Sequence, residues 1–338
     1  KCHNYLKNYN GPKYNKLLND ISVEKYFIQC EKMFHSGLND SDSIMSLIDN
    51  WLEIDDYKTK LIYPVMRTLY NAKEYTKLIK FIKDLKQDKE LPKWLVYDID
   101  HYSALIEIYH NQNKELGKKL LLKCINNLNN QKSNDYLAVS SRVFTSFGNN
   151  FPKEKITESL IIESIEIKET LSDKPGLARS YGALARMYFD KEPTSKKAYE
   201  SCNKWLSLNK ERNDFFGIIM SKNYLAKIYF SLYKSNKSDI NKLDKSKSLY
   251  AENIKSMQNQ IDDGSKIQIF TSYADLMEIA KYEKNEKLFA NYSEELFKLI
   301  KNFGKIENKF FKDIFIKAFD SKFKKDFIPR NKIKEILG

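Results

Sequence analysis

Apolar residues recur along this chain every three or four positions, the spacing of helices that bury one face. Alternating apolar and polar residues, which would indicate half-buried strands, are absent. Residues 177–189 and 218–230 repeat one order of large, small and aromatic side chains. The corresponding residues are Leu184, Ala185 and Tyr188 in the first stretch and Leu225, Ala226 and Tyr229 in the second. The pattern predicts an all-α chain built from repeated helices.

The same pattern extends in both directions from this central pair. Six equivalent positions follow one another at nearly regular intervals, of which the last is the longest, and they are Met66, Leu105, Val143, Leu184, Leu225 and Tyr273. A period of about 40 residues is typical of a helical solenoid, in which hairpins of two helices stack to bury their apolar faces. We therefore predict an α-α superhelix of about six to seven helical hairpins with a C-terminal capping helix.

The pattern divides the chain into three expected parts. Residues 1–20 are polar and contain a Gly-Pro pair, so we expect an irregular entry segment. Residues 21–305 are expected to form the repeat array, and residues 306–338 the capping helices that cover its last face. Within the array, the polar residues 234–247 lengthen the last spacing, and we expect them to form a long loop.

The most regular part of the chain resembles the tetratricopeptide repeats. Tyr181, Leu184, Ala185 and Tyr188 match the first-helix positions of one such repeat, and residues 163–185 look like the long-period variety found in bacterial sensors and regulators. The resemblance covers residues 153–230. It implies a right-handed superhelix whose first helices line a concave face. It also implies a non-catalytic scaffold or sensor that binds a protein or peptide there.

Two longer-protein alternatives stay open beside this one. The chain begins at Lys1 rather than Met, so we expect it to be processed or to be a piece of a longer protein. It could be the sensor arm of a signalling ATPase of the STAND type, with antiviral defence as one setting. It could instead belong to a peptide-responsive transcription regulator of the Rap or PlcR kind. In either case the additional domain would precede Lys1.

The net charge of +13 changes this picture little. Six of the 58 basic residues are arginines, and the 52 lysines are scattered along every segment. A basic surface attracts acidic proteins and nucleic acids, but scattered lysines are more typical of a solvated surface. We expect a protein or peptide partner, for which an acidic segment is one option. We do not expect nucleic acid, although the charge does not exclude it.

Motifs for catalysis are missing from the sequence. Neither phosphate-binding glycine motif is present, nor is a G-x-S-x-G or an H-E-x-x-H motif. The four cysteines are far apart, which argues against a disulfide framework and a thiolate metal site, and they are Cys2, Cys30, Cys124 and Cys202. No apolar run approaches the ~20 residues of a membrane span. We therefore expect a cytoplasmic protein with no catalytic residues, metal or cofactor.

The scarce arginines mark the candidate site. The proposed ligand-binding residues all lie on predicted first helices, and they are Arg142, Arg179, Arg186, Asn223 and Lys227. Arg179 and Arg186 stand two helical turns apart and so share a helix face, and Lys227 takes the place of Arg186 in the next repeat. Guanidinium groups bind carboxylates with two hydrogen bonds, and an amide can hold a peptide backbone. Two hypotheses stay open: a basic inner groove for an acidic or C-terminal peptide segment, or ion pairs between neighbouring repeats.

Overall fold

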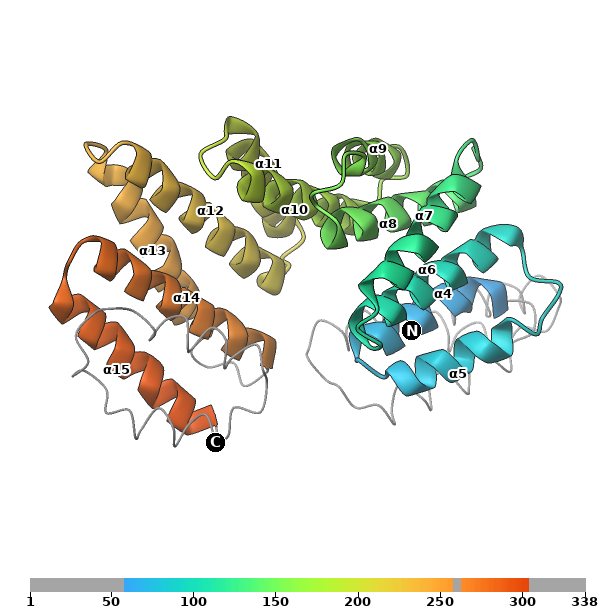
Figure 1. The fold of residues 1–338 in the computed structure, drawn as a ribbon, viewed down its shortest axis with the longest axis horizontal. Coiled ribbons are helices and arrows are strands. Elements are labelled where there is room, and N and C mark those ends of the chain that lie inside the picture. Colours follow the sequence, from blue (N-terminus) through green and yellow to red (C-terminus); the bar gives the residue numbers. More distant parts are fainter. Residues whose placement is uncertain (1–57, 258–262, 304–338) are drawn as a thin grey trace, which may run out of the picture. The chain divides into compact units, whose positions relative to one another are not determined.

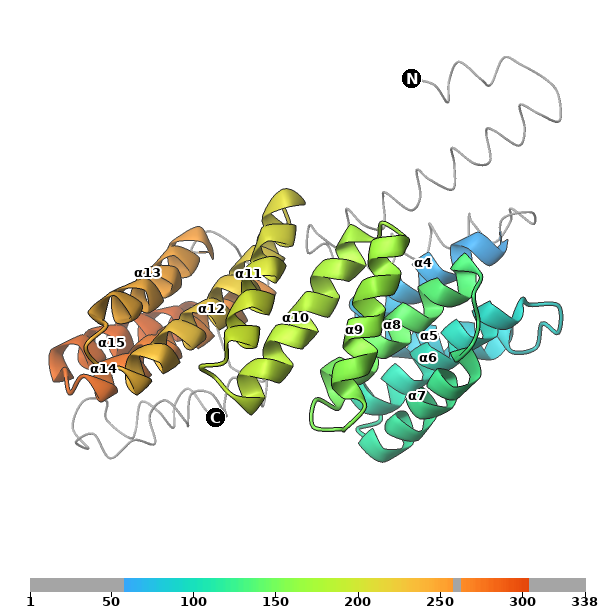
Figure 2. The same ribbon diagram turned by 90° about the horizontal axis from the view of Figure 1, so that it is seen from above.

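The computed structural model describes residues 58–257 and 263–303, and the described residues form twelve helices and no strand (Figures 1 and 2). The helices are α4 (Lys58–Asn71), α5 (Tyr75–Leu85), α6 (Lys93–Tyr109), α7 (Lys114–Leu128), α8 (Asn134–Asn150), α9 (Thr157–Thr170), α10 (Lys174–Lys191), α11 (Lys196–Glu211), α12 (Phe215–Ser235), α13 (Ile240–Met257), α14 (Asp263–Tyr282) and α15 (Glu286–Phe303). The all-α prediction is confirmed for this part of the chain. The predicted entry segment, residues 21–57 at the start of the predicted array, and the predicted capping helices lie outside it.

The described helices pack as a helical repeat, in two compact units that divide within α9, after Ile167. In the first unit α4 packs on α5, α6 on α7, and α8 on both α6 and α7. In the second unit α10 pairs with α11, α12 with α13 and α14 with α15, and each of these pairs also contacts the next. We call α4, α6, α8, α10, α12 and α14 the first helices. Hairpins stacked on their neighbours agree with the predicted solenoid, and the sense of its superhelix stays a prediction.

The six equivalent positions are all buried, with exposed fractions of at most 8%. Ala185 and Ala226 are completely buried, at 0%. At Ala226 the second helix comes close, because Ser246 on α13 donates a hydrogen bond from its Oγ to the Ala226 carbonyl at 2.8 Å. The small residues of the repeat therefore stand where two helices approach each other.

The helices α10 and α12 are entered through the same kind of turn, repeated in successive hairpins. Ser172 and Asn213 have positive φ angles of 55° and 52°, and they end the preceding helices in Schellman motifs. The following Asp173 and Asp214 cap the next helix, each accepting a hydrogen bond at 2.9 Å from a backbone N–H three residues later. The period of the sequence therefore corresponds to a turn geometry that is repeated between hairpins.

A glycine in the first turn of each of these two helices allows the preceding helix to approach. A Cβ atom on Gly176 would lie 2.0 Å from Oδ2 of the capping Asp173 and 2.8 Å from Cε of Lys168, and one on Gly217 would lie 2.6 Å from Cγ of Asn209. Lys168 and Asn209 are both buried, so neither has room to move aside. These glycines are therefore explained by close packing.

The prediction of a long loop over residues 234–247 was wrong. Helix α12 continues to Ser235, a short turn follows, and α13 begins at Ile240. The polar composition concealed a helix, because Leu243, Ser246 and Tyr250 are buried at helical spacing while the lysines and aspartates between them face outward or lie partly exposed. The longer spacing between repeats comes mostly from longer helices, with 21 residues in α12 and 18 in α13 against 18 in α10 and 16 in α11.

Candidate functional site

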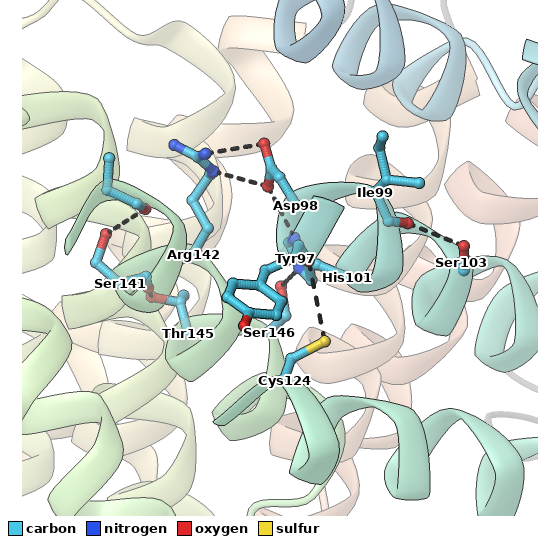
Figure 3. A network of polar contacts seen from close by, with 11 residues as sticks. Tyr97, Asp98, Ile99, His101, Ser103, Cys124, Ser141, Arg142, Thr145 and Ser146 are labelled. Carbon is cyan, nitrogen blue, oxygen red and sulfur yellow. Dashed lines mark hydrogen bonds and ion pairs between the residues drawn. The ribbon is translucent and has the colours of Figure 1, made fainter. Parts of the chain in front are cut away.

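Arg142 links three successive first helices of the first unit. From α8, its Nη2 and Nε donate hydrogen bonds to Oδ2 and Oδ1 of Asp98 on α6, at 2.9 and 3.3 Å (Figure 3). Its guanidinium carbon also lies 4.0 Å from the ring centroid of Tyr63 on α4, close enough for a cation–π contact. Arg142 is thus held from two sides.

Asp98 stays ionised although it is fully buried. Burial alone would raise the pKa of its carboxyl group, but the charge of Arg142 and the nearby His101 outweigh this and hold the pKa below its ordinary value. Burial would likewise lower the pKa of Arg142, and the nearby carboxylate raises it instead. The pair is therefore a charged ion pair in which each group depends on the other.

His101 extends this network toward α8. Its Nδ1 lies 3.6 Å from Oδ1 of Asp98, and its Nε2 lies 2.8 Å from Oγ of Ser146 (Figure 3). Serine, histidine and aspartate in this order also form the triad of serine hydrolases. Here all three lie within helices, so their own backbone N–H groups are used by helical hydrogen bonds. We interpret the contact as a polar bridge between α6 and α8.

Asn223 connects three helices of the second unit. It is 3% exposed, and its Oδ1 accepts hydrogen bonds from Nδ2 of Asn253 on α13 at 2.7 Å and from Oγ of Ser272 on α14 at 3.1 Å. Its Nδ2 donates to Oε1 of Gln268 on α14 at 2.7 Å. Both ends of the amide are therefore engaged between neighbouring hairpins.

Lys227 pairs with an acid on the next first helix. Its Nζ lies 3.5 Å from Oδ2 of Asp275 on α14. Burial raises the pKa of Asp275, and the raising prevails over the opposite effects of Lys227 and of a hydrogen bond with Tyr250. Burial would lower the pKa of Lys227, but Asp275 raises it above its ordinary value. The pair thus joins α12 to α14, although the Asp275 carboxylate loses part of its hydration there.

Arg186 and Lys227 also lie over aromatic rings that contact each other. The guanidinium carbon of Arg186 is 5.4 Å from the ring centroid of Trp205, and Nζ of Lys227 is 5.5 Å from that of Tyr224. The Trp205 and Tyr224 centroids are 6.0 Å apart. We call these four residues the cation–aromatic ladder. Arg179 lies two turns before Arg186 on α10 and is exposed.

The structure places the five predicted site residues in two groups. Arg142 belongs to the first unit, whereas Arg179, Arg186, Asn223 and Lys227 belong to the second. Arg142, Asn223 and Lys227 make contacts between neighbouring hairpins. This agrees with the second hypothesis, in which the predicted site residues connect neighbouring repeats. Ligand binding by these residues stays a prediction.

Two acidic partners, Asp98 and Asp275, were missed by sequence reasoning. A signal existed for the first, since Asp98 falls between Leu95 and Tyr102 on the apolar face of its helix. An acid at a core position requires a buried cation, and Arg142 was already a candidate. The signal for Asp275 was weaker, because its side chain is 21% exposed and an acid at a partly exposed position does not require a buried cation.

The described residues offer little reactive chemistry. Burial raises the pKa of the Cys124 and Cys202 thiols to about 12, so both are protonated and unreactive at neutral pH. Within residues 58–257 and 263–303, no three His, Cys, Asp or Glu side chains are grouped so that they could hold a metal ion. None of the helices in these ranges has the length and apolar character needed to cross a membrane. The chain matches no protein-family model and no curated protein.

Proposed function

We propose that the chain is a non-catalytic scaffold or sensor that binds a protein or peptide segment along its first helices, as the tetratricopeptide resemblance implies. The helical-repeat arrangement supports this proposal, because stacked hairpins present an extended surface of fixed side chains. The proposed partner carries acidic side chains or a C-terminal carboxylate.

The cation–aromatic ladder is the observation that carries the proposal. Arg186 and Lys227 hold the same position in successive first helices, and both side chains are partly exposed. Each cation is oriented by a neighbouring ring, and Trp205 is itself fixed, because a Cβ on Gly182 would lie 2.8 Å from that ring. Cations spaced one per repeat match carboxylates spaced along an extended peptide.

Preorganisation explains why such a surface would bind well. A long side chain that is already held in one position loses less conformational entropy when a ligand arrives. The internal contacts of Asn223 support the ladder in the same way, because they fix α12 against α13 and α14. In this proposal the bracing contacts and the binding surface are parts of one arrangement.

The test is the double substitution Arg186→Ala with Lys227→Ala. A displayed peptide library selects binders of the unaltered protein, and calorimetry then measures their affinity for both proteins. We expect acidic segments among the binders and a loss of ~1.5–3 kcal/mol for each charge-assisted hydrogen bond removed. The matched control is Lys204→Ala with Lys255→Ala, which removes two exposed charges elsewhere in the same unit.

Thermal unfolding of the same variants completes the test. If the two cations only brace the repeats, the double variant will melt earlier and bind peptides as before. That result, or a selection that yields no acidic peptide, would reject the proposed groove.

A further inference from the structure

A second group of cations lies near the end of the α12–α13 hairpin, where the lysines belong to α13 rather than to a first helix. The Oη atoms of Tyr199 on α11 and Tyr229 on α12 are 3.3 Å apart. Two ammonium groups of α13 approach the same Tyr229 ring, with Nζ of Lys242 and Lys245 at 5.6 and 5.7 Å from its centroid. We call these four residues the lysine–tyrosine cluster.

The positive charge of this region is poorly balanced. Residues 234–247 hold five lysines and two aspartates, a net charge of +3, and one of these lysines, Lys247, is paired with Glu283 at 2.7 Å. Lys242 has Asp239 at 3.9 Å, and Lys245 has no acidic partner among the described residues. Lys234 and Lys237 lie over aromatic rings at 4.6 and 5.3 Å and likewise have no ion pair within the part of the chain that the structure describes. A mobile anion would find several donors here.

The two phenols add a directed donor to these charges. The hydrogen bond with Tyr229, together with Lys242 and Lys245, holds the pKa of Tyr199 below its ordinary value, although burial acts in the other direction. Burial and the same hydrogen bond raise the pKa of Tyr229 to about 12. Either hydroxyl can donate to the other, and in both cases one phenol proton is left for another acceptor.

We propose that the lysine–tyrosine cluster binds the phosphate group of a phosphorylated side chain on a partner protein. Ammonium groups are compact charges suited to phosphate oxygens, and a phenol can donate to a third oxygen. Lys242 also lies in the first turn of α13, where the helix dipole adds positive potential. The donors thus come from two directions, the lysine side chains of α13 and a hydroxyl of the tyrosine pair on α11 and α12.

The size of the region points to a single phosphate group rather than to a nucleic acid strand. A nucleic acid surface needs cations in a stripe that follows many phosphates. In the first unit the corresponding hairpin ends carry Tyr70, Tyr75 and Tyr109 packed on one another, with no described lysine over their rings. There Lys118 does lie over an aromatic ring, but it is paired with Glu154 at 2.6 Å. These two hairpin ends of the first unit therefore lack the arrangement of lysines and tyrosines found at the α12–α13 end.

Calorimetry with defined probes tests this inference. The probes are inorganic phosphate, a degenerate peptide library centred on phosphoserine, the same library with serine, and a (dT)30 oligonucleotide, all at one ionic strength. We expect the phosphorylated library to bind and the serine library not to bind. In Lys242→Ala with Lys245→Ala, the Kd for the phosphorylated library should rise at least about tenfold.

Three further variants test whether binding depends specifically on the positive charges of Lys242 and Lys245. Lys242→Arg with Lys245→Arg should retain binding, and so should the control Lys204→Ala with Lys255→Ala. Arg186→Ala with Lys227→Ala should also retain phosphate binding, which separates this inference from the proposed peptide groove. The lysines are on the surface, so circular dichroism should show an unchanged fold in each case.

Several outcomes with these probes and variants would overturn the inference. They are absence of binding by the phosphorylated library, equal binding of both libraries, loss of binding in the control variant, and binding of inorganic phosphate alone. Tighter binding of (dT)30 that depends on Lys242 and Lys245 would also overturn it, in favour of a nucleic acid surface.

Discussion

Asp98 and Arg142 form a two-hydrogen-bond ion pair between residues far apart in the sequence, with the carboxylate fully buried and the guanidinium 18% exposed. Each residue belongs to a different hairpin, so the pair joins α6 to α8. It fixes the alignment of these two helices, which hydrophobic contacts alone would not specify. Its consequence can be measured as stability.

Arg142→Ala should destabilise the protein by ~3–5 kcal/mol, because it leaves a buried carboxylate without its cation. Urea unfolding followed by circular dichroism measures the loss. Arg142→Lys is the matched control; it keeps a charge but loses the fork geometry and part of the Tyr63 contact, so its loss should be smaller. If the alanine variant lost no more stability than an ordinary surface substitution does, other groups would have to compensate the charge of Asp98.

The pH dependence of stability should follow the lowered pKa of Asp98. A carboxyl group whose pKa is lower in the folded state stabilises the protein above its unfolded pKa, near 3.8, and this contribution disappears as the pH falls through the folded value. The stability difference between the unaltered protein and Asp98→Asn should therefore be large at pH 6 and shrink below pH 4. A difference that stays constant between pH 2 and pH 6 would contradict this.

Ala226→Leu should destabilise the protein by ~1–3 kcal/mol, because the added methyl groups must enter a completely buried position beside Ser246. The melting temperature measures the effect. Ala251→Leu on the exposed face of α13 is the matched control and should change stability little. Equal melting temperatures for both variants would show that α12 and α13 can separate at Ala226 without loss.

Ser172→Gly should stabilise the protein by roughly 0.5–1 kcal/mol, since a side chain in the left-handed region costs ~1–2 kcal/mol and glycine loses part of this gain through its greater freedom in the unfolded state. The φ angle of Ser172 is 55°. The same change in the middle of an exposed helix face, Lys204→Gly, should instead destabilise by about 1 kcal/mol. Destabilisation by both substitutions would mean that the serine side chain contributes a contact at the turn.

The repeat architecture could be predicted because its signal is local and repeated. Leu184 and Leu225 occupy equivalent buried positions, and the period between them is the period of the turns at Ser172 and Asn213. The long-loop prediction failed at the start of α13, where polar residues outnumber the apolar residues that indicate a helix. Only a few apolar residues in α13, among them Leu243 and Tyr250, carry its helical pattern through a polar segment.

The positions of the candidate cations could be predicted, but their partners could not. The sequence places Arg142 and Lys227 on first helices, where the structure has them. Their acids belong to other hairpins, and which residues meet across two hairpins depends on how the helices stack. Sequence periodicity gives the face of a helix but not the small rotations and shifts that bring two charges into contact.

The matching turns at Ser172–Asp173 and Asn213–Asp214 make the intervening hairpin an exchangeable module. Excision of residues 173–213 would join Ser172 directly to Asp214, and the new junction would keep the left-handed residue, the aspartate cap and the glycine three positions later. Duplication of the same segment would preserve this junction as well. The turn geometry can therefore accommodate the insertion or deletion of one whole period. A gene encoding this chain could grow or shrink by one hairpin at a time.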